Sequence, residues 1–419
     1  MLVRLNQSAL WPALLHIGRA IAAKPVIPLL SGIHVQADSD GLTLTASNHS
    51  MMLRCRLDGE RAAILRSGSI VIPARYWMEI VRHTAASDTI TLEVLEGWRL
   101  RMSAGRAVYH LNGMNPEGYP VMSMEQSDET VQLALPSSKL RKAVQQVAFA
   151  ASCSEARPIL TGVLCQLTGG KLRMTSTDGI RLASRTIALS QHEEKDTDKV
   201  SWHQTPPTRQ EPNVTETTDA DSTLPAGQSA ASSSDAMAHV IIPAKHLSDY
   251  AKAMGDGHGT TAITLSPHRV MMETNGFAMQ SVVLEGVYPP IDKIVSAPNP
   301  SRSMAMTVMT RRLLQALERT ALLSGDGSVV RLHSRPDGVM ALNAYHAEIG
   351  DVQEEVDVAS LHGEPISISC NARYMADLIE AVESEYVVLR MSDRQSPIIV
   401  SPEGSDSALY ALTPIRTRD

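Results

Sequence analysis

The sequence is poor in aromatic residues, which excludes a core built mainly from aromatic rings. Aromatic side chains make up 4% of the 419 residues and include only two phenylalanines, whereas methionine occurs 20 times. Apolar residues still reach 43%, so we expect sizeable cores filled by aliphatic and methionine side chains. The chain is too long for one ordinary core, and its length predicts two to four domains.

The sequence also lacks any stretch that is long and apolar enough to cross a membrane. Its first residues, MLVRLNQSAL, lack the charged region and apolar block of a signal peptide. The four cysteines show no CxxC or CxxxH spacing, which excludes the common zinc-ligand patterns. These absences predict a cytoplasmic protein with reduced, mostly buried thiols, no membrane partner, no metal and no other cofactor.

The sequence does contain a strand-to-helix motif that occurs three times. The copies are IVIPARYWMEIV at 70–81, VIIPAKHLSDYA at 240–251 and ISISCNARYMADLI at 366–379. When the alanines after the predicted strands are superposed, three basic residues coincide in the first turn of the predicted helices: Arg75, Lys245 and Arg373. Apolar positions then follow at helical spacing in all three copies. Internal repetition of this kind predicts tandem units of one fold.

A second predicted helix precedes this motif in each copy. These leading helices lie in LNQSALWPALLHIGRAIAAK (5–24), LPSSKLRKAVQQVAFA (135–150) and TVMTRRLLQALERTALLS (307–324). Each opens with a polar residue of the kind that caps helices, followed by an apolar period of about 3.6 residues. A shorter match pairs EGYP at 117–120 with EGVYPP at 285–290.

The spacing between matched positions grows inside the second copy, which locates an insertion. Segment 190–237 is rich in Ser, Thr, Asp, Glu and Pro, and we expect it to be a disordered insert. The predicted domains are therefore 1–127, 128–300 and 301–419. Each combines two helices with alternating runs typical of antiparallel strands, so the predicted fold class is α+β with helices packed on one face of the sheet.

Positive charge is concentrated on the leading helices of an acidic chain. The whole sequence has 38 basic and 45 acidic residues and a net charge of −7. The leading helices instead carry one acid, Glu318, and eight basic residues: Arg19, Lys24, Lys139, Arg141, Lys142, Arg311, Arg312 and Arg319. An ordinary solvated helix face usually mixes both signs, so we favour a surface for the phosphate backbone of duplex DNA without base reading. Few aromatic residues accompany these charges, which argues against a single-strand stacking groove.

Several motifs together resemble the bacterial DNA sliding clamps, the beta subunit family of DNA polymerase III. They are STDGIRLA (176–183), RPILTG (157–162), KPVIPLLSG (24–32) and a C-terminal PIR (414–416). The resemblance implies a clamp fold in which each chain forms half of a six-domain ring. It also implies a head-to-tail homodimer that encircles duplex DNA and acts as a processivity factor. The implied partners are the replicative polymerase catalytic subunit, a clamp loader and other proteins with clamp-binding motifs.

The resemblance also implies two protein-binding surfaces. A pocket for short apolar peptides would be formed by Arg157, Ile159, Leu160, Thr177, Gly179, Ile180, Arg181, Leu182, Pro289, Ile294, Asn371, Tyr374, Thr413, Pro414, Ile415 and Arg416. The dimer interface would join Tyr109 and Leu111 to Leu322 and Leu323. Ile180 stands where the family usually has histidine, which implies a shifted peptide preference.

No catalytic motif is found, and we predict that the chain has no enzymatic activity. Asp178 could be a catalytic acid, but a turn between strands is the favoured interpretation. The segment QHEE at 191–194 falls in the insert and lacks a second group of ligands at a metal spacing. Two alternatives stay open: a diverged clamp paralogue that serves as a peptide-binding hub in repair or specialised replication, and, less favoured, a hydrolase or nuclease.

Overall fold

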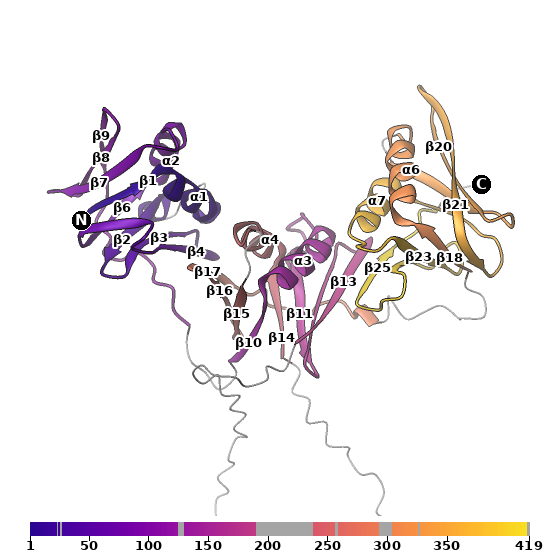
Figure 1. The fold of residues 1–419 in the computed structure, drawn as a ribbon. Helices are drawn as coiled ribbons and strands as arrows, with labels where there is room; N and C mark the ends of the chain where they lie inside the picture. Colours follow the sequence, from indigo (N-terminus) through magenta and orange to yellow (C-terminus); the bar gives the residue numbers. More distant parts are fainter. Residues whose placement is uncertain are drawn as a thin grey trace, which may run out of the picture.

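The computed structural model describes residues 1–22, 24–25, 27–124, 130–189, 238–255, 259–292, 304–325 and 327–416. The insert predicted at 190–237 and both predicted domain boundaries, at 127/128 and 300/301, lie outside these residues. Figure 1 shows three units set along an arc, with their helices on its concave side and their sheets behind. This arrangement confirms the predicted α+β fold of three similar units.

Each unit places two α-helices on antiparallel strands. The first contains β1 (Leu2–Asn6), α1 (Gln7–Ile17), β2 (Gly32–Asp38), β3 (Gly41–Ser47), β4 (Met51–Leu57), β5 (Ala62–Arg66), β6 (Gly68–Pro73), α2 (Ala74–His83), β7 (Thr89–Leu95), β8 (Arg99–Ala104) and β9 (Ala107–Asn112). The second contains β10 (Val131–Pro136), α3 (Ser137–Val147), β11 (Gly162–Thr168), β12 (Lys171–Thr177), β13 (Arg181–Ala188), β14 (Ala238–Pro243), α4 (Ala244–Ala253), β15 (Thr260–Leu265), β16 (Arg269–Thr274) and β17 (Phe277–Val282). The third contains β18 (Met304–Met309), α6 (Thr310–Leu322), β19 (Val329–Ser334), β20 (Val339–His346), β21 (Gly350–His362), β22 (Ser367–Asn371), α7 (Ala372–Glu380), β23 (Tyr386–Met391), β24 (Ile398–Pro402) and β25 (Ala408–Leu412). Short 3₁₀ turns η1 (Gly18–Ala20) and η3 (Ala148–Ala150) extend α1 and α3, and η2 (Pro28–Ser31) and η4 (Pro158–Thr161) precede β2 and β11.

The three-fold repeat extends to single hydrogen bonds. The three aligned alanines are the first residues of α2, α4 and α7. Three residues before each alanine, the strand exchanges a backbone bond with the segment that leaves its unit. These bonds join Met114 N to Val71 O (2.9 Å), Leu284 N to Ile241 O (2.8 Å) and Ile415 N to Ser369 O (2.7 Å). Residues of the three units can therefore be compared position by position.

The predicted polar caps of the leading helices are wrong. No side-chain capping bond is made by the residues at the cap positions, Asn6, Pro136 and Met309. The polar residues at these starts are instead buried first residues of α1, α3 and α6. They bond across to the end of the second helix or to the segment after it: Gln7 to Val81 O (3.0 Å), Ser137 to Thr261 (2.8 Å) and Thr310 to Ser384 O (2.7 Å). Buried polar groups need partners, so these residues tie each helix pair together.

Two of the sheets continue from one unit into the next. In each case the last strand of a unit pairs with the fourth strand of the unit before it, β17 with β4 and β25 with β13. The same backbone bond closes both pairings, from Val282 N to Ser50 O (2.9 Å) and from Thr413 N to Ile180 O (2.8 Å). The units are therefore joined by antiparallel backbone pairing rather than by side chains alone.

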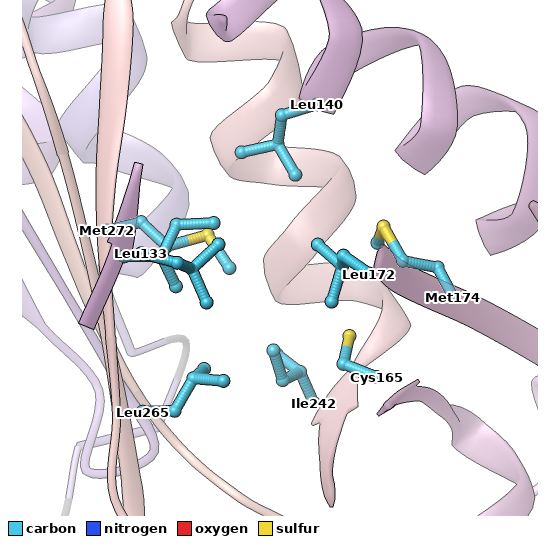
Figure 2. Close-up of a pocket in the computed structure, with 9 residues that line it drawn as sticks. Leu133, Leu140, Cys165, Leu172, Met174, Ile242, Leu265 and Met272 are labelled. Carbon is cyan, nitrogen blue, oxygen red and sulfur yellow. The ribbon is translucent and has the colours of Figure 1, made fainter. Parts of the chain in front are cut away.

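The core is aliphatic and rich in methionine, as the composition predicts. In the second unit it encloses an apolar cavity of about 10 Å³ (Figure 2), which is barely the size of one water molecule. The lining residues are Leu133, Leu140, Cys165, Leu172, Met174, Ile242, Ile263, Leu265 and Met272. This cavity offers no polar partner and belongs to the packed core. None of the described helices is long and apolar enough to cross a membrane.

Candidate DNA surface, peptide pocket and ring joint

Half of the basic residues predicted on the leading helices are exposed without a counter-charge. Lys24, Lys139, Arg311 and Arg312 are exposed, and none forms a salt bridge within the described part of the chain. Lys139 lies on α3, and both arginines lie in the first turn of α6. Both helices are on the concave side of the arc (Figure 1). These cations are available to an external anion.

The other four have partners within the chain. The contacts are Arg19 to Asp249 (3.1 Å), Arg141 to the backbone oxygen of Gly255 (2.7 Å), Lys142 to Glu383 (2.7 Å) and Arg319 to both carboxylate oxygens of Glu354 (2.6 and 2.8 Å). The first and third pairs each join two units. Three of these partners are carboxylates that compensate the positive charge, so the free positive charge on the leading helices is smaller than the sequence predicts. The two inter-unit pairs also link neighbouring units.

The second helices, α2, α4 and α7, carry further basic residues in their first turns. Arg75, Lys245 and Arg373 are all exposed. The acids that follow them on these helices are all paired with arginine: Glu79 with Arg82 (2.9 Å), Asp249 with Arg19 (3.1 Å) and Asp377 with Arg181. Their negative charge is thereby largely compensated. Sequence reasoning missed exposed Lys252 in the last turn of α4, which a charge count of the second helices would have found.

The turn 177–181 forms the centre of the predicted peptide pocket. One carboxylate oxygen of Asp178 accepts the backbone N–H groups of Ile180 and Arg181, both at 2.9 Å. Thr177 Oγ1 donates to Arg181 O (2.7 Å) and accepts from Gly179 N (3.1 Å). Gly179 has φ +94°, a conformation that favours glycine. Asp178 is therefore a turn residue, as the sequence favours, and Ile180 is left 49% exposed at the tip.

Apolar pocket residues gather on the outer face of the sheet between the second and third units. Leu182 is buried there with Tyr288, Ile291 and Ile399, and Ile159 packs against them. Tyr288 fixes the cluster because its hydroxyl donates to Gly162 O (3.2 Å) and accepts from Thr177 N (3.1 Å). Tyr288 belongs to the repeated motif EGVYPP, and the family resemblance does not assign it to the pocket.

The third unit supplies the remaining predicted pocket residues. Thr413 bonds to Ile180, Ile415 bonds to Ser369, and Asn371 caps α7 by accepting from Tyr374 N (3.0 Å). Arg157 lies near Gly179, and Leu160 is buried. Pro289, Pro414 and Arg416 are placed beside this group as chain neighbours of the residues above. Ile294 lies outside the described residues.

At the junction between the first and second units, the position that matches the predicted peptide pocket is polar. Ser50, Met51 and His246 there correspond to Ile180, Arg181 and Tyr374. His246 is buried, with Nδ1 2.7 Å from Ser281 Oγ and Nε2 3.5 Å from Ser50 Oγ. A polar hydrogen-bonded group therefore stands where the second junction has an exposed isoleucine and a tyrosine ring.

His246 makes the first junction sensitive to acid. Burial, with a smaller effect of Lys245 against the opposing effect of Asp249, lowers its pKa from 6.5 to about 4. The unfolded chain then binds more protons between these values, so stability falls as pH drops. We expect the free energy of unfolding to decrease by about 2 kcal/mol between about pH 7 and about pH 5. His246→Gln should remove this part of the pH dependence in urea unfolding, and an unchanged pH slope would contradict the assignment.

Two unpaired strand edges lie at opposite ends of the arc (Figure 1). Within the described strands, β9 pairs only with β8, and residues 350–357 of β21 pair only with β20. Large apolar side chains are exposed near both edges. Tyr109 is 36% exposed and Leu322 is 79% exposed, whereas Leu111 and Leu323 are partly buried. Unpaired strand edges with exposed apolar side chains are available for pairing with another chain.

Within the described ranges, no group of three or more His, Cys, Asp or Glu side chains could hold a metal ion. The segment 191–194 lies outside those ranges. All four cysteines are free: Cys165 and Cys370 are buried, Cys55 is partly buried and Cys153 is exposed.

Comparison with known proteins gives one consistent family. Family models of the DNA polymerase III beta subunit match the chain over residues 1–123 (N-terminal domain), 134–201 and 215–290 (central domain) and 299–416 (C-terminal domain). The beta sliding clamp of Halalkalibacterium halodurans is 28% identical over 409 residues, 96% of each chain. That of Staphylococcus aureus is 27% identical over 406 residues, 95% of each chain. The DNA polymerase sliding clamp of Bacillus subtilis superposes over 100% of both chains with 25% identity and a TM-score of 0.82. The chain therefore belongs to the DNA polymerase III beta subunit family, the beta sliding clamps.

Proposed function

We propose that two copies of this chain close head to tail into a six-unit ring around duplex DNA. As a sliding clamp, the chain is a processivity factor of DNA replication. The ring would keep the replicative polymerase catalytic subunit on its template by topology, so its contacts with phosphate can be weak and non-specific. Tethering of this kind raises the effective concentration of polymerase at the primer end.

One observation carries the ring proposal. The repeat places Tyr109 of β9 at the same position as Met279 of β17 and Tyr410 of β25. Strands β17 and β25 are the ones that pair with the preceding unit within the chain, and each of these two residues lies two positions before the last paired residue of its strand. Both counterparts are 0% exposed, yet Tyr109 is 36% exposed. A position that is buried at both junctions within the chain but exposed on β9 supports a third junction of the same kind, which β9 would form with another chain. A heterologous contact repeated in this way closes a ring.

The repeat also gives the register of this junction. Leu111 corresponds to Ser281 and Leu412, which pair with the first residues of β4 and β13, Met51 and Arg181. The first residue of β21 is Gly350, so Leu111 of one chain would pair with Gly350 of its partner. Tyr109 would then face Val352, and the neighbouring position Leu322 corresponds to Phe149 at the second junction. Both proposed dimer contacts thus have counterparts inside the chain.

The charges of the two edges are complementary. Arg99 and Arg101 lie on β8 beside β9, and Arg106 lies in the turn between these strands. Strand β21 carries Asp351, Glu354, Glu355 and Asp357. Opposite charges across the joint favour the head-to-tail arrangement and oppose pairing of like edges.

The DNA role is tested by the exposed arginines of α6. Replacing Arg311 and Arg312 together by glutamate should weaken binding to duplex DNA. It should also reduce by about two the slope of the logarithm of the binding constant against the logarithm of the salt concentration. Fluorescence anisotropy over a salt series measures both quantities. Lys171→Glu, an exposed change on a β-hairpin away from the helices, is the control. If both variants behave alike, α6 does not contact DNA.

The pocket between the second and third units would bind short apolar peptides of the polymerase catalytic subunit, the clamp loader and other proteins with clamp-binding motifs. Its apolar cluster and its strand-like tail at 413–416 suit such segments. We infer a non-catalytic role in the cytoplasm, with the protein on the nucleoid. Rescue of a clamp-depleted cell would support the replicative role, and failure to rescue would favour the paralogue hub.

A further inference from the structure

Arg181 lies in an enclosed position between the second and third units. Its guanidinium carbon is 4.3 Å from the ring centre of Tyr374 and 5.5 Å from that of Phe149. The side chain is only 13% exposed. Removing a charge from water is unfavourable unless a counter-charge remains close. The position of Arg181 therefore depends on its carboxylate partners.

Two carboxylates bind this guanidinium at different nitrogen atoms. Asp178 contacts it at 3.1 Å with one oxygen, while its other oxygen holds the turn through two backbone N–H groups. Asp377, on α7 of the third unit, binds Arg181 Nη1. Asp178 is shared with the turn, whereas Asp377 is the carboxylate that anchors Arg181 to the third unit. Asp377 is not among the predicted pocket residues.

We propose that Asp377 is a positioning residue for the peptide pocket. Acting through Arg181, it holds the turn 177–181 and the Tyr374 ring in the arrangement that receives a peptide. This role rests on the proposed peptide-binding function. Arg373 lies four residues before Asp377 on the same helix and is exposed.

The chain provides a matched control at its first junction. Asp249 occupies the position on α4 that Asp377 occupies on α7. It also pairs with an arginine of the preceding unit, Arg19. The residue there that corresponds to Arg181 is Met51, so this ion pair supports a junction without reaching a peptide pocket. Losing either pair removes an ion pair that joins two units, but only loss of the Asp377 pair should change peptide affinity.

The experiment measures binding of a fluorescein-labelled peptide from the polymerase catalytic subunit to the full chain by anisotropy. Asp377→Asn should weaken binding about tenfold, and Asp377→Glu should recover most of it. Asp249→Asn should stay within about twofold of wild type at a comparable thermal midpoint. In an Arg181→Gln background, Asp377→Asn should have no further effect.

The outcomes separate the two proposals. Unchanged affinity in Asp377→Asn, with wild type binding normally, would overturn the positioning role alone. Full additivity of Asp377→Asn with Arg181→Gln would do the same, because it would show that Asp377 does not act through Arg181. Absence of binding by wild type would overturn the peptide pocket itself, and the positioning role with it.

Discussion

Tyr109→Asp is expected to separate the ring into single chains. The substitution places a carboxylate at a position whose two counterparts are fully buried, opposite Val352 and among the acids of β21. Burying an unpaired charge in such a joint costs about 3 kcal/mol. Because a two-fold ring contains two identical joints, the total is about 6 kcal/mol, which raises the dimer dissociation constant about 10⁴-fold. Analytical ultracentrifugation should then give the 45.4-kDa mass of one chain.

Leu65→Asp is the matched control for this prediction. Leu65 is 55% exposed and also lies on an edge strand, β5, but at the opposite edge of the same sheet from β9. The Leu65→Asp protein should remain dimeric at concentrations where the Tyr109→Asp protein is monomeric. A Tyr109→Asp protein that keeps the wild-type mass would show that β9 is not the ring joint. Loss of folding is checked by the thermal midpoint of the same samples.

The second large effect is expected at the tip of the pocket turn. Ile180→Asp should weaken binding of the polymerase peptide about 30-fold, or about 2 kcal/mol, because it removes an apolar contact and introduces a charge. Ile180 is 49% exposed, and its backbone bonds to Asp178 and Thr413 do not involve the side chain. The fold and the dimer should therefore be preserved. Primer-extension length after loading should fall together with peptide affinity.

Two further variants sharpen the pocket test. Val121→Asp introduces the same charge at a side chain that is 79% exposed but lies after the first unit, away from the pocket, and it should bind peptide like wild type. Ile180→His restores the residue usual in the family and should bind at least as well as wild type. Equal binding by Ile180→Asp and wild type would place the peptide elsewhere on the chain.

The two junctions within the chain and the proposed junction at β9 differ in their side chains at matched positions. The first is closed by His246 and by the Arg19–Asp249 pair, the second combines Arg181 with an apolar cluster, and the third is left open at Tyr109. Backbone pairing supplies the common geometry, while the side chains at matched positions decide the role. A protein built this way can keep its curvature while one junction evolves as a peptide site.

The sequence by itself determined the repeated units, their α+β character and the basic leading helices. It could do so because apolar periodicity and the count of charges are local properties. The pocket residues came from family resemblance, since their apolar members cannot be told from core residues in a single sequence. Ile180 and Leu182 are neighbours of similar chemistry, yet one is 49% exposed and the other is buried at 2%.

Only the tertiary structure decided which charges are free and which edges are open. Arg19 and Lys139 look alike in sequence, but Arg19 pairs with Asp249, 230 residues away. Likewise Gln7, Ser137 and Thr310 resemble helix caps, yet they are buried and bond to the end of the second helix or to the segment after it. Such pairings depend on how units pack against one another. The physical reason is that hydrogen bonds and ion pairs are set by distance in space, which local sequence patterns do not encode.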